Sequence, residues 1–305
     1  MRVVVAGGTG FLGAAITAAL RAEGHSVVVA SRSRPQPSRS NQPLPEWRYA
    51  DVTDPASLPA ALEGAAVVVD AVQFPNMPVE SPAKGYTFEN IDLRGTYRLV
   101  DAAAGAGAAL YVGISGVGAA EDAPYHWLRS KWQEEQYIHN SGIPAVIFRP
   151  SWIYGPGDVS LNRFLGFARF LPFVPVIGDG RTRINPLFIG DMAGHVAASV
   201  SLSAARGRVF EIGGPHVMTM DEVIRTALRV SGKRRFLLHS PKRLMKVLGG
   251  FAAHLPGPPL TADAVEFITM DGIADNSDLV SAFDLPLTPL ADGLRTYLGR
   301  PGASE

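Results

Sequence analysis

The sequence predicts an α/β fold: a doubly wound parallel sheet with a smaller, mainly C-terminal lobe. Three observations predict it. Short apolar runs rich in β-branched residues alternate with longer segments of helical periodicity through the first 150 residues. A cluster of glycines comes directly after the first apolar run. Beyond Pro150 the pattern loosens and Gly and Pro become frequent, which indicates a lobe built from the later segments.

The expected strands are apolar throughout and do not alternate with polar residues. Such runs are typical of strands covered by helices on both faces of a parallel sheet. The helical segments between them end at glycine, as helices often do. Right-handed crossovers through these helices give the doubly wound arrangement. The strands are expected at residues 3–6, 26–30, 67–71, 109–114 and 145–148.

The composition limits the class of protein. Of 305 residues, 47% are apolar and 18% are charged, and 28 Lys and Arg balance 28 Asp and Glu. This argues against disorder and against nucleic-acid binding through bulk charge. Cysteine is absent, which excludes disulfides and cysteine-ligated metals, and no two histidines have the H-x-x-x-H spacing of a metal site.

No part of the sequence predicts a targeting signal or a membrane span. The start, MRVVVAGG, is typical of a first strand, and no run of ~18 apolar residues occurs. We expect a cytoplasmic protein, for which peripheral membrane contact or a protein partner stays open. The loop 34–47 has no hydrophobic pattern and is expected to be mobile.

The glycine cluster predicts a dinucleotide site. In VVVAGGTGFLGAAI, Gly7, Gly10 and Gly13 stand between a strand and a helix. The turn needs a positive φ, the backbone must approach a pyrophosphate closely, and the helix must pack near the strand. The helix N-terminus then supplies amides and a dipole for the phosphates. Residues 1–150 are therefore predicted to form a dinucleotide-binding Rossmann domain.

The end of the second strand favours NADP(H) over NAD(H). The carboxylate that accepts from the ribose 2′-hydroxyl of NAD is missing, and Ser31, Arg32 and Arg34 stand there instead. Arginine matches a 2′-phosphate, although these arginines could simply solubilise a loop. Asp51, just after the third strand, is expected either to accept from the adenine amine or to cap the next helix.

The later segments divide between the sheet and a second lobe. Residues 187–189 and 209–212 are expected to return to the sheet, and residues 151–305 otherwise to form a substrate-side lobe. The segments 167–178 and 244–260 are strongly apolar for such a lobe. Core packing is one interpretation, and a lipophilic pocket or a partner-facing patch is the other.

Seven motifs along residues 1–215 resemble one family, the extended and atypical short-chain dehydrogenase/reductases, which are NAD-dependent epimerase/dehydratase-like. They are AGGTGFLG, ADVTDPASL, ENIDLRGTYRLVDAA, GISGVGA, SKWQEEQYIHNSGIPAVIFRPSWIYGPGD, NPLFIGDMAGHVA and VFEIGGP. The later PLTADAVEFITMDGIADNSDL and FDLPLTPLADGLRTYL are similar to bacterial relatives of the NADPH-binding accessory subunit of respiratory complex I. The resemblance implies further cofactor contacts from Thr9, Phe11, Leu12, Val52, Ala71, Lys131, Pro150 and Ile153.

The resemblance also implies hydride transfer at a nicotinamide. In the family a tyrosine exchanges the proton, a lysine lowers its pKa and holds the ribose, and a serine holds the substrate oxygen. Ser115 in GISG takes the serine position and Lys131 the lysine position, whereas Trp127 stands where the tyrosine is expected. An indole N–H does not exchange a proton at any accessible pH. An NADP(H)-binding protein with weak or absent turnover is thus expected.

Three interpretations of Lys131 stay open. It holds the ribose in a protein that only binds cofactor, it serves a catalyst whose donor is Tyr125, Tyr154 or water, or it is a solvated helix residue paired with Glu135. The corresponding alternatives are an active reductase or epimerase with a lipophilic or sugar-like small-molecule substrate, and a redox-sensing or assembly protein in which the nucleotide is structural.

Overall fold

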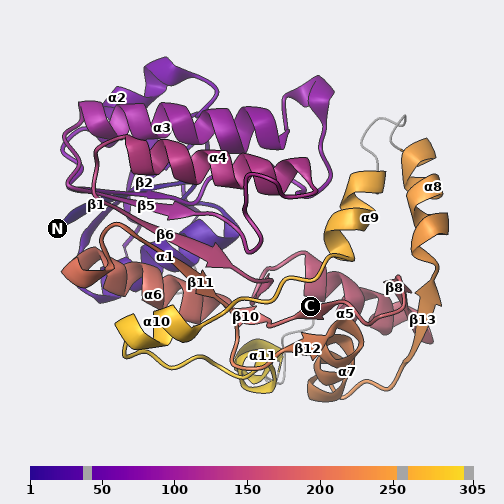
Figure 1. Cartoon of the computed structure of the whole chain (residues 1–305). Coiled ribbons are helices and arrows are strands. Elements are labelled where there is room, and N and C mark those ends of the chain that lie inside the picture. The colour runs from indigo at the N-terminus through magenta and orange to yellow at the C-terminus, as the bar shows by residue number, and fades with distance from the viewer. Residues whose placement is uncertain (37–42, 253–259, 299–305) are drawn as a thin grey trace.

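The computed structural model describes residues 1–36, 43–252 and 260–298. Its centre is a seven-stranded, wholly parallel sheet in the order β11-β6-β5-β4-β1-β2-β3 (Figure 1). The strand order reverses at β1, which lies between β2 and β4, and the predicted doubly wound fold is confirmed. The strands are β1 (Arg2–Ala6), β2 (Ser26–Ser31), β3 (Glu46–Tyr49), β4 (Val67–Asp70), β5 (Leu110–Ile114), β6 (Ala145–Pro150) and β11 (Arg208–Ile212).

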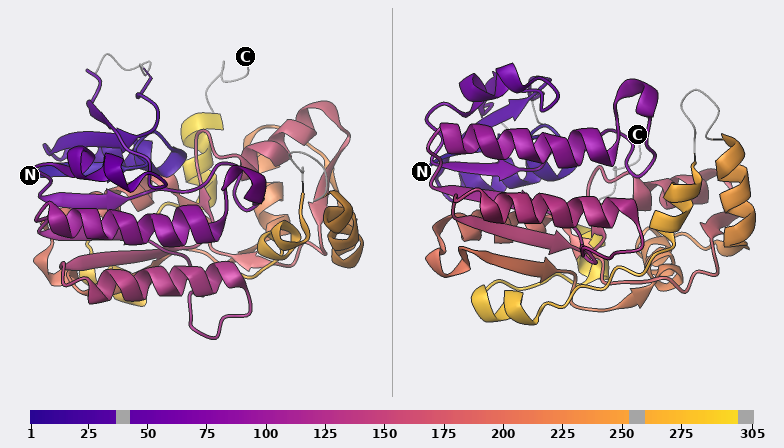
Figure 2. Two further views of the ribbon diagram at one scale, coloured as in Figure 1. Left: turned by 90° about the horizontal axis from the view of Figure 1, so that it is seen from above. Right: turned by 45° about the horizontal axis from the view of Figure 1, so that its top comes forward.

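Helices cover both faces of this sheet (Figure 1, Figure 2). In β1, Val3 and Val5 pack in one core with α1, α6 and α10, whereas Val4 and Ala6 pack in the other with α2, α3 and α4. Successive side chains point to opposite faces, so burial of both faces requires an uninterrupted apolar run. The helices are α1 (Phe11–Ala22), α6 (Ile189–Ser201) and α10 (Ser277–Ala282), and opposite them α2 (Leu58–Leu62), α3 (Arg94–Gly105) and α4 (His126–Asn140).

The later segments form a second lobe with a core of its own. Buried side chains there include Leu161, Val174, Ile224 and Leu294. Three two-stranded sheets complete it, β7 with β10, β8 with β13 and β9 with β12. Its elements are β7 (Ile153–Tyr154), α5 (Ser160–Phe170), β8 (Phe173–Ile177), β9 (Arg183–Ile184), β10 (Leu187–Phe188), β12 (Met218–Thr219), α7 (Met220–Val230), β13 (Phe236–Ser240), α8 (Lys242–Ala252), α9 (Ala262–Ile268) and α11 (Leu290–Leu298).

Only one of the two segments expected to return to the large sheet enters it. Residues 209–212 lie in β11 at the sheet edge, but Leu187 and Phe188 pair with β7 as β10. The side chain of the preceding Asn185 exchanges two hydrogen bonds with the backbone of Ala274, and α6 begins directly after β10. These bonds hold the segment at the second lobe, so the prediction for 187–189 is corrected. The boundary at residue 150 stays a prediction.

Parts of two other predictions lie outside the described residues. They are residues 37–42 of the loop 34–47 and residues 253–259 of the apolar segment 244–260. In the segment 167–178, Ala168, Val174 and Val176 are buried in the second core, as the core-packing interpretation expects. None of the described helices has both the length and the apolarity to cross a bilayer.

Candidate functional site

The glycine turn lies where β1 meets α1, at the reversal of strand order. Gly7 has φ +73°, and a Cβ there would lie 2.5 Å from the carbonyl oxygen of Ala71. A Cβ on Gly13 would collide with the Gly7 carbonyl. The amide of Ala71 in turn donates to Ala6 at 3.0 Å, which fixes the end of β4 beside the turn. Gly7 and Gly13 are therefore required by the close packing of the turn itself.

Gly10 is under a different constraint. It is the N-cap of α1 with an extended backbone (φ −74°), and a Cβ there would approach only the Gly7 carbonyl, at 3.2 Å. Thr9, Gly10 and Phe11 are exposed, Leu12 is half-buried, and the first turn of α1 has no acidic residue. The amides at this helix start are thus accessible to an anion, which the helix dipole would stabilise.

The residues at the end of β2 present positive charge on one side of the turn. Arg32 and Arg34 are exposed, and their guanidinium carbons lie 5.8 Å from the ring centre of Tyr86 and 4.8 Å from that of Trp47. Ser31 is buried, donates to the carbonyl of Ser33 at 2.7 Å and accepts from the Trp47 indole at 3.2 Å. No carboxylate within the described ranges pairs with either arginine.

Asp51 and Val52 mainly organise the chain beside the turn. The Asp51 carboxylate accepts from the backbone and the hydroxyl of Thr53 at 2.8 and 2.7 Å, so it closes a local turn. Val52 is buried, and its carbonyl accepts from Arg98 at 2.9 Å. Two other predicted cofactor contacts, Pro150 and Ile153, lie at the end of β6 and at the start of β7.

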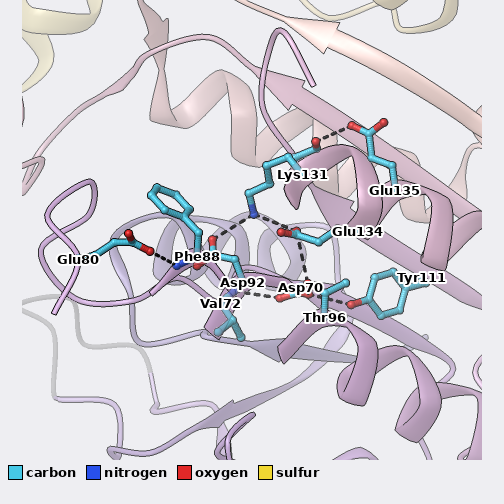
Figure 3. A network of polar contacts seen from close by, with 11 residues as sticks. Asp70, Val72, Glu80, Phe88, Asp92, Thr96, Tyr111, Lys131, Glu134 and Glu135 are labelled. Atoms are coloured by element: carbon cyan, nitrogen blue, oxygen red, sulfur yellow. Dashed lines mark hydrogen bonds and ion pairs between the residues drawn. The ribbon is translucent and has the colours of Figure 1, made fainter. Parts of the chain in front are cut away.

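Lys131 lies in a buried ion cluster on the inner face of α4 (Figure 3). Its ammonium is 3.1 Å from Asp92 and 2.9 Å from Glu134, and its side chain is only 14% exposed. Thr96 donates to Asp70 at 3.1 Å and lies 3.5 Å from Glu134. The Tyr111 hydroxyl also donates to Asp70, at 2.8 Å. Lys131 therefore contacts two of the three buried carboxyls, and among the described residues Asp70 is linked to them only through Thr96.

Burial sets the protonation of this cluster. It raises the pKa of Asp92 to about 6 and that of Glu134 to about 8, although Lys131 opposes both shifts. Burial alone would lower the pKa of Lys131, but Glu134 and Asp92 together raise it above its ordinary value. Near neutral pH the lysine is charged and the carboxyls share at least one proton, because like charges so close together cannot all ionise.

Ser115 belongs to a second polar group. Its hydroxyl donates to Glu135 at 2.5 Å, and Arg149 forms two further hydrogen bonds to the same carboxylate, at 2.8 and 2.6 Å. The interpretation of Lys131 as the partner of Glu135 is thus wrong: Lys131 pairs with Glu134 at i+3, and Glu135 turns to β6. Ser115, directly after β5, and Lys131, on α4, bond to different carboxylates.

Trp127 and Tyr125 form an aromatic cluster beside the ion cluster. Their rings stack at 4.5 Å, and Trp127, 2% exposed, also packs on Phe88 and Phe267. The Tyr125 hydroxyl donates to Glu266 of α9 at 3.1 Å, and burial with this bond raises its pKa. Tyr125 is the N-cap of α4 and not part of the helix, so its phenol points to α9 while Lys131 points to Asp92.

Sequence reasoning did not find Asp70, Asp92, Glu134 or Glu135 as site residues. Asp92 reaches Lys131 from a π-helical turn, Phe88–Leu93, in which an additional residue per turn changes the direction of the side chains. The signal available in the sequence was the pair of glutamates three and four residues after Lys131. Among the described residues no group of His, Asp and Glu is arranged to hold a metal ion.

Comparison with known proteins identifies the family of this chain. The pattern of the NAD dependent epimerase/dehydratase family matches residues 3–213. The chain belongs to this family. The predicted resemblance is confirmed. The chain is a nucleotide-binding protein similar to the short-chain dehydrogenase/reductases.

The chain is similar to proteins with different names. It is 28% identical over 226 residues to NADH dehydrogenase [ubiquinone] 1 alpha subcomplex subunit 9, mitochondrial, from Arabidopsis thaliana, a match that covers 72% of this chain but only 55% of that protein. It is 27% identical to photosystem II assembly factor Ycf39 from Guillardia theta, covering 82% and 78% of the two chains. UDP-glucuronic acid 4-epimerase from Bacillus cereus, solved with UDP-glucuronic acid and NAD, shares the fold (TM-score 0.75, 20% identity, 98% of each chain).

Replacing Glu134 by glutamine tests the protonation of the ion cluster. The pKa of Glu134, about 8 in the folded chain, exceeds its ordinary 4.5, so the folded state binds more protons between these values and the free energy of unfolding falls as pH rises through them. Glu134→Gln resembles the protonated acid and removes this dependence. Relative to the original protein, the variant should gain up to about 1.4 kcal/mol per pH unit within that window.

Urea unfolding at a series of pH values measures this difference. Glu63→Gln, which changes an exposed carboxylate on the same domain, is the matched control and should leave the pH dependence unchanged. Parallel stability curves for Glu134→Gln and the original protein would mean that Glu134 is ionised throughout.

Proposed function

We propose that this protein binds NADP(H) in the glycine turn and transfers hydride weakly or not at all. The position of Lys131 carries the proposal, because its ammonium lies at 3.1 and 2.9 Å from two buried carboxyls. An ammonium lowers the pKa of a neighbouring phenol by its positive field. The negative charge that Asp92 and Glu134 share near neutral pH opposes that field, so Lys131 is poorly placed to activate a proton donor even where one is present.

The turn fits the dinucleotide. Gly7 allows the close approach of the backbone, and the open side of Gly10 leaves room for a pyrophosphate above the α1 amides. When bound, the nicotinamide would supply the hydride. Arg32 and Arg34, exposed and without a carboxylate partner among the described residues, suit a ribose 2′-phosphate and support NADP(H) over NAD(H).

Two further observations support weak turnover. The Ser115 hydroxyl donates its hydrogen bond to Glu135, whereas the serine of an active site must donate a hydrogen bond to the substrate oxygen. Trp127 stands at the position of the family's tyrosine, and its buried ring offers only an indole N–H, which cannot act as an acid. In the described part of the chain that N–H has no hydrogen-bond partner.

A structural use of the nucleotide is part of the proposal. Relatives of this chain are named as a subunit of NADH dehydrogenase and as an assembly factor of photosystem II, which supports work with a protein partner. A ligand that binds only the folded state stabilises it by RT ln(1 + [L]/Kd). The active alternative, a reductase or epimerase on a lipophilic or sugar-like substrate, requires another donor, and Tyr125 is already bonded to Glu266. A cytoplasmic location stays a prediction.

Arg32→Ala tests the cofactor preference. The account predicts that NADPH binds more tightly than NADH and that the variant loses about 1.5–3 kcal/mol of NADPH binding, the value of a hydrogen bond to a charged group. NADH binding should hardly change, and neither should binding by Arg181→Ala, an exposed arginine of the second lobe. Calorimetric titration with NADPH and with NADH measures these affinities. Equal affinities of the original protein for the two nucleotides would contradict the proposed preference.

Restoring the tyrosine tests the role of the ion cluster. Trp127→Tyr alone should leave turnover of carbonyl or quinone test substrates near its low level, because the negative charge shared by Asp92 and Glu134 still opposes the charge of Lys131. Adding Asp92→Asn and Glu134→Gln should raise turnover, up to the roughly 10²–10⁴-fold that general acid–base catalysis contributes.

NADPH oxidation followed by absorbance measures this turnover, and circular dichroism checks that each variant folds. A large gain from Trp127→Tyr alone would show that the carboxyls do not matter. Ready turnover by the original protein, stopped by Tyr125→Phe, would instead make Tyr125 the donor and overturn the proposal.

A further inference from the structure

One face of α8 exposes a stripe of large apolar side chains. Leu244, Val247, Leu248 and Phe251 are 52, 56, 50 and 73% exposed. Their spacing of i, i+3, i+4 and i+7 places them on one side of the helix, an apolar stripe that ordinarily faces a protein core. Here it faces away from the lobe, and α8 lies at the edge of the molecule (Figure 1, Figure 2).

The opposite side of α8 is held firmly, so the orientation of the stripe is fixed. Gly249 packs against the start of α9 so closely that a Cβ there would lie 2.8 Å from the carbonyl carbon of Thr261. Lys242 and Lys246 form ion pairs with Glu266 of α9, at 2.7 and 2.5 Å. Turning the apolar stripe inward would break these contacts.

The chain around α8 is strongly basic although the whole protein has no net charge. From residue 223 to residue 262 the sequence has eight Lys and Arg and no Asp or Glu. Three of these cations pair with carboxylates outside the segment, at Asp221 and Glu266. The structure, over the residues it describes, pairs no carboxylate with the other five, which are Arg229, Lys233, Arg234, Arg235 and Arg243.

Most of these cations line one open pocket of about 740 Å³ at the start of β13. The pocket also includes Phe236, which is 61% exposed, and Leu238, 46% exposed, lies next on the same face of the strand. β13 leads from the pocket to α8 through Pro241 alone. One short strand thus joins the basic pocket to the apolar stripe of α8 at this end of the second lobe.

We propose that the end of the lobe formed by β13 and α8 binds the surface of an anionic phospholipid bilayer. An apolar helical stripe without acidic residues, flanked by cations that have no carboxylate partner among the described residues, matches the two forces that hold a peripheral helix at such a surface. The apolar side chains of α8 lie at the boundary of the acyl chains, and the basic pocket takes lipid phosphates. Phospholipid is the occupant that satisfies both features at once.

Vesicle co-sedimentation tests the proposal with the intact chain. The protein should bind vesicles of phosphatidylcholine and phosphatidylglycerol but not of phosphatidylcholine alone, and added salt should weaken the binding. Val247→Ser with Phe251→Ser should lower the bound fraction by at least ~10-fold. Val280→Ser, an equally exposed apolar side chain on the distant α10, is the matched control and should bind like the original protein.

Arg229→Gln with Arg234→Gln should reduce binding to the anionic vesicles in the same assay. Binding that survives loss of the apolar pair, or no binding by the original protein, overturns the proposal. Sedimentation velocity provides the alternative outcome: a dimer that Val247→Ser with Phe251→Ser dissociates, without vesicle binding, assigns the face to a second copy of the chain. The vesicle and sedimentation assays do not measure nucleotide affinity, so their outcome is independent of the proposed function.

Discussion

The ion cluster around Lys131 is the interaction on which the rest of the site depends. One ammonium on α4 bonds a carboxyl from the π-helical turn and another from its own helix, and Thr96 links these to Asp70 at the end of β4. A buried charge without its partners costs several kcal/mol, so none of these elements can move independently. The arrangement fixes α3 and α4 over the sheet, and it also fixes which atoms Lys131 can reach.

The proposed function separates the residues expected to hold a dinucleotide from those expected to move a proton. The residues expected to hold a dinucleotide suit that role. Gly7 and Gly13 permit the tight turn, and Gly10 has no side chain to fill the space in front of the α1 amides. The proposed function expects the three positions that move a proton to be altered. Ser115 bonds Glu135, Lys131 contacts two carboxyls, and the buried Trp127 stands where the family resemblance implies a tyrosine. Cofactor binding and proton transfer depend on different residues, so one can persist without the other.

Local periodicity in the sequence was enough to predict the sheet and the glycine turn. The strands were found because burial on both faces demands unbroken apolar runs, and the turn was found because only glycine tolerates its geometry. The partners of Lys131 could not be found this way. Asp92 reaches it through a π-helical turn. Glu135 bonds Arg149 of β6, a contact between two different elements, which leaves Glu134 to Lys131. β10 was misplaced for a similar reason, since Asn185 bonds Ala274, 89 residues later.

The position of Lys131 when nucleotide is bound tests the central claim most directly. A crystal structure of the protein with NADP⁺ would measure it. The account predicts that the Lys131 ammonium remains on Asp92 and Glu134, with the phosphates at the glycine turn and the 2′-phosphate near Arg32 and Arg34. If the ammonium instead leaves both carboxyls and bonds the nicotinamide ribose, the lysine is available for catalysis and the account is contradicted.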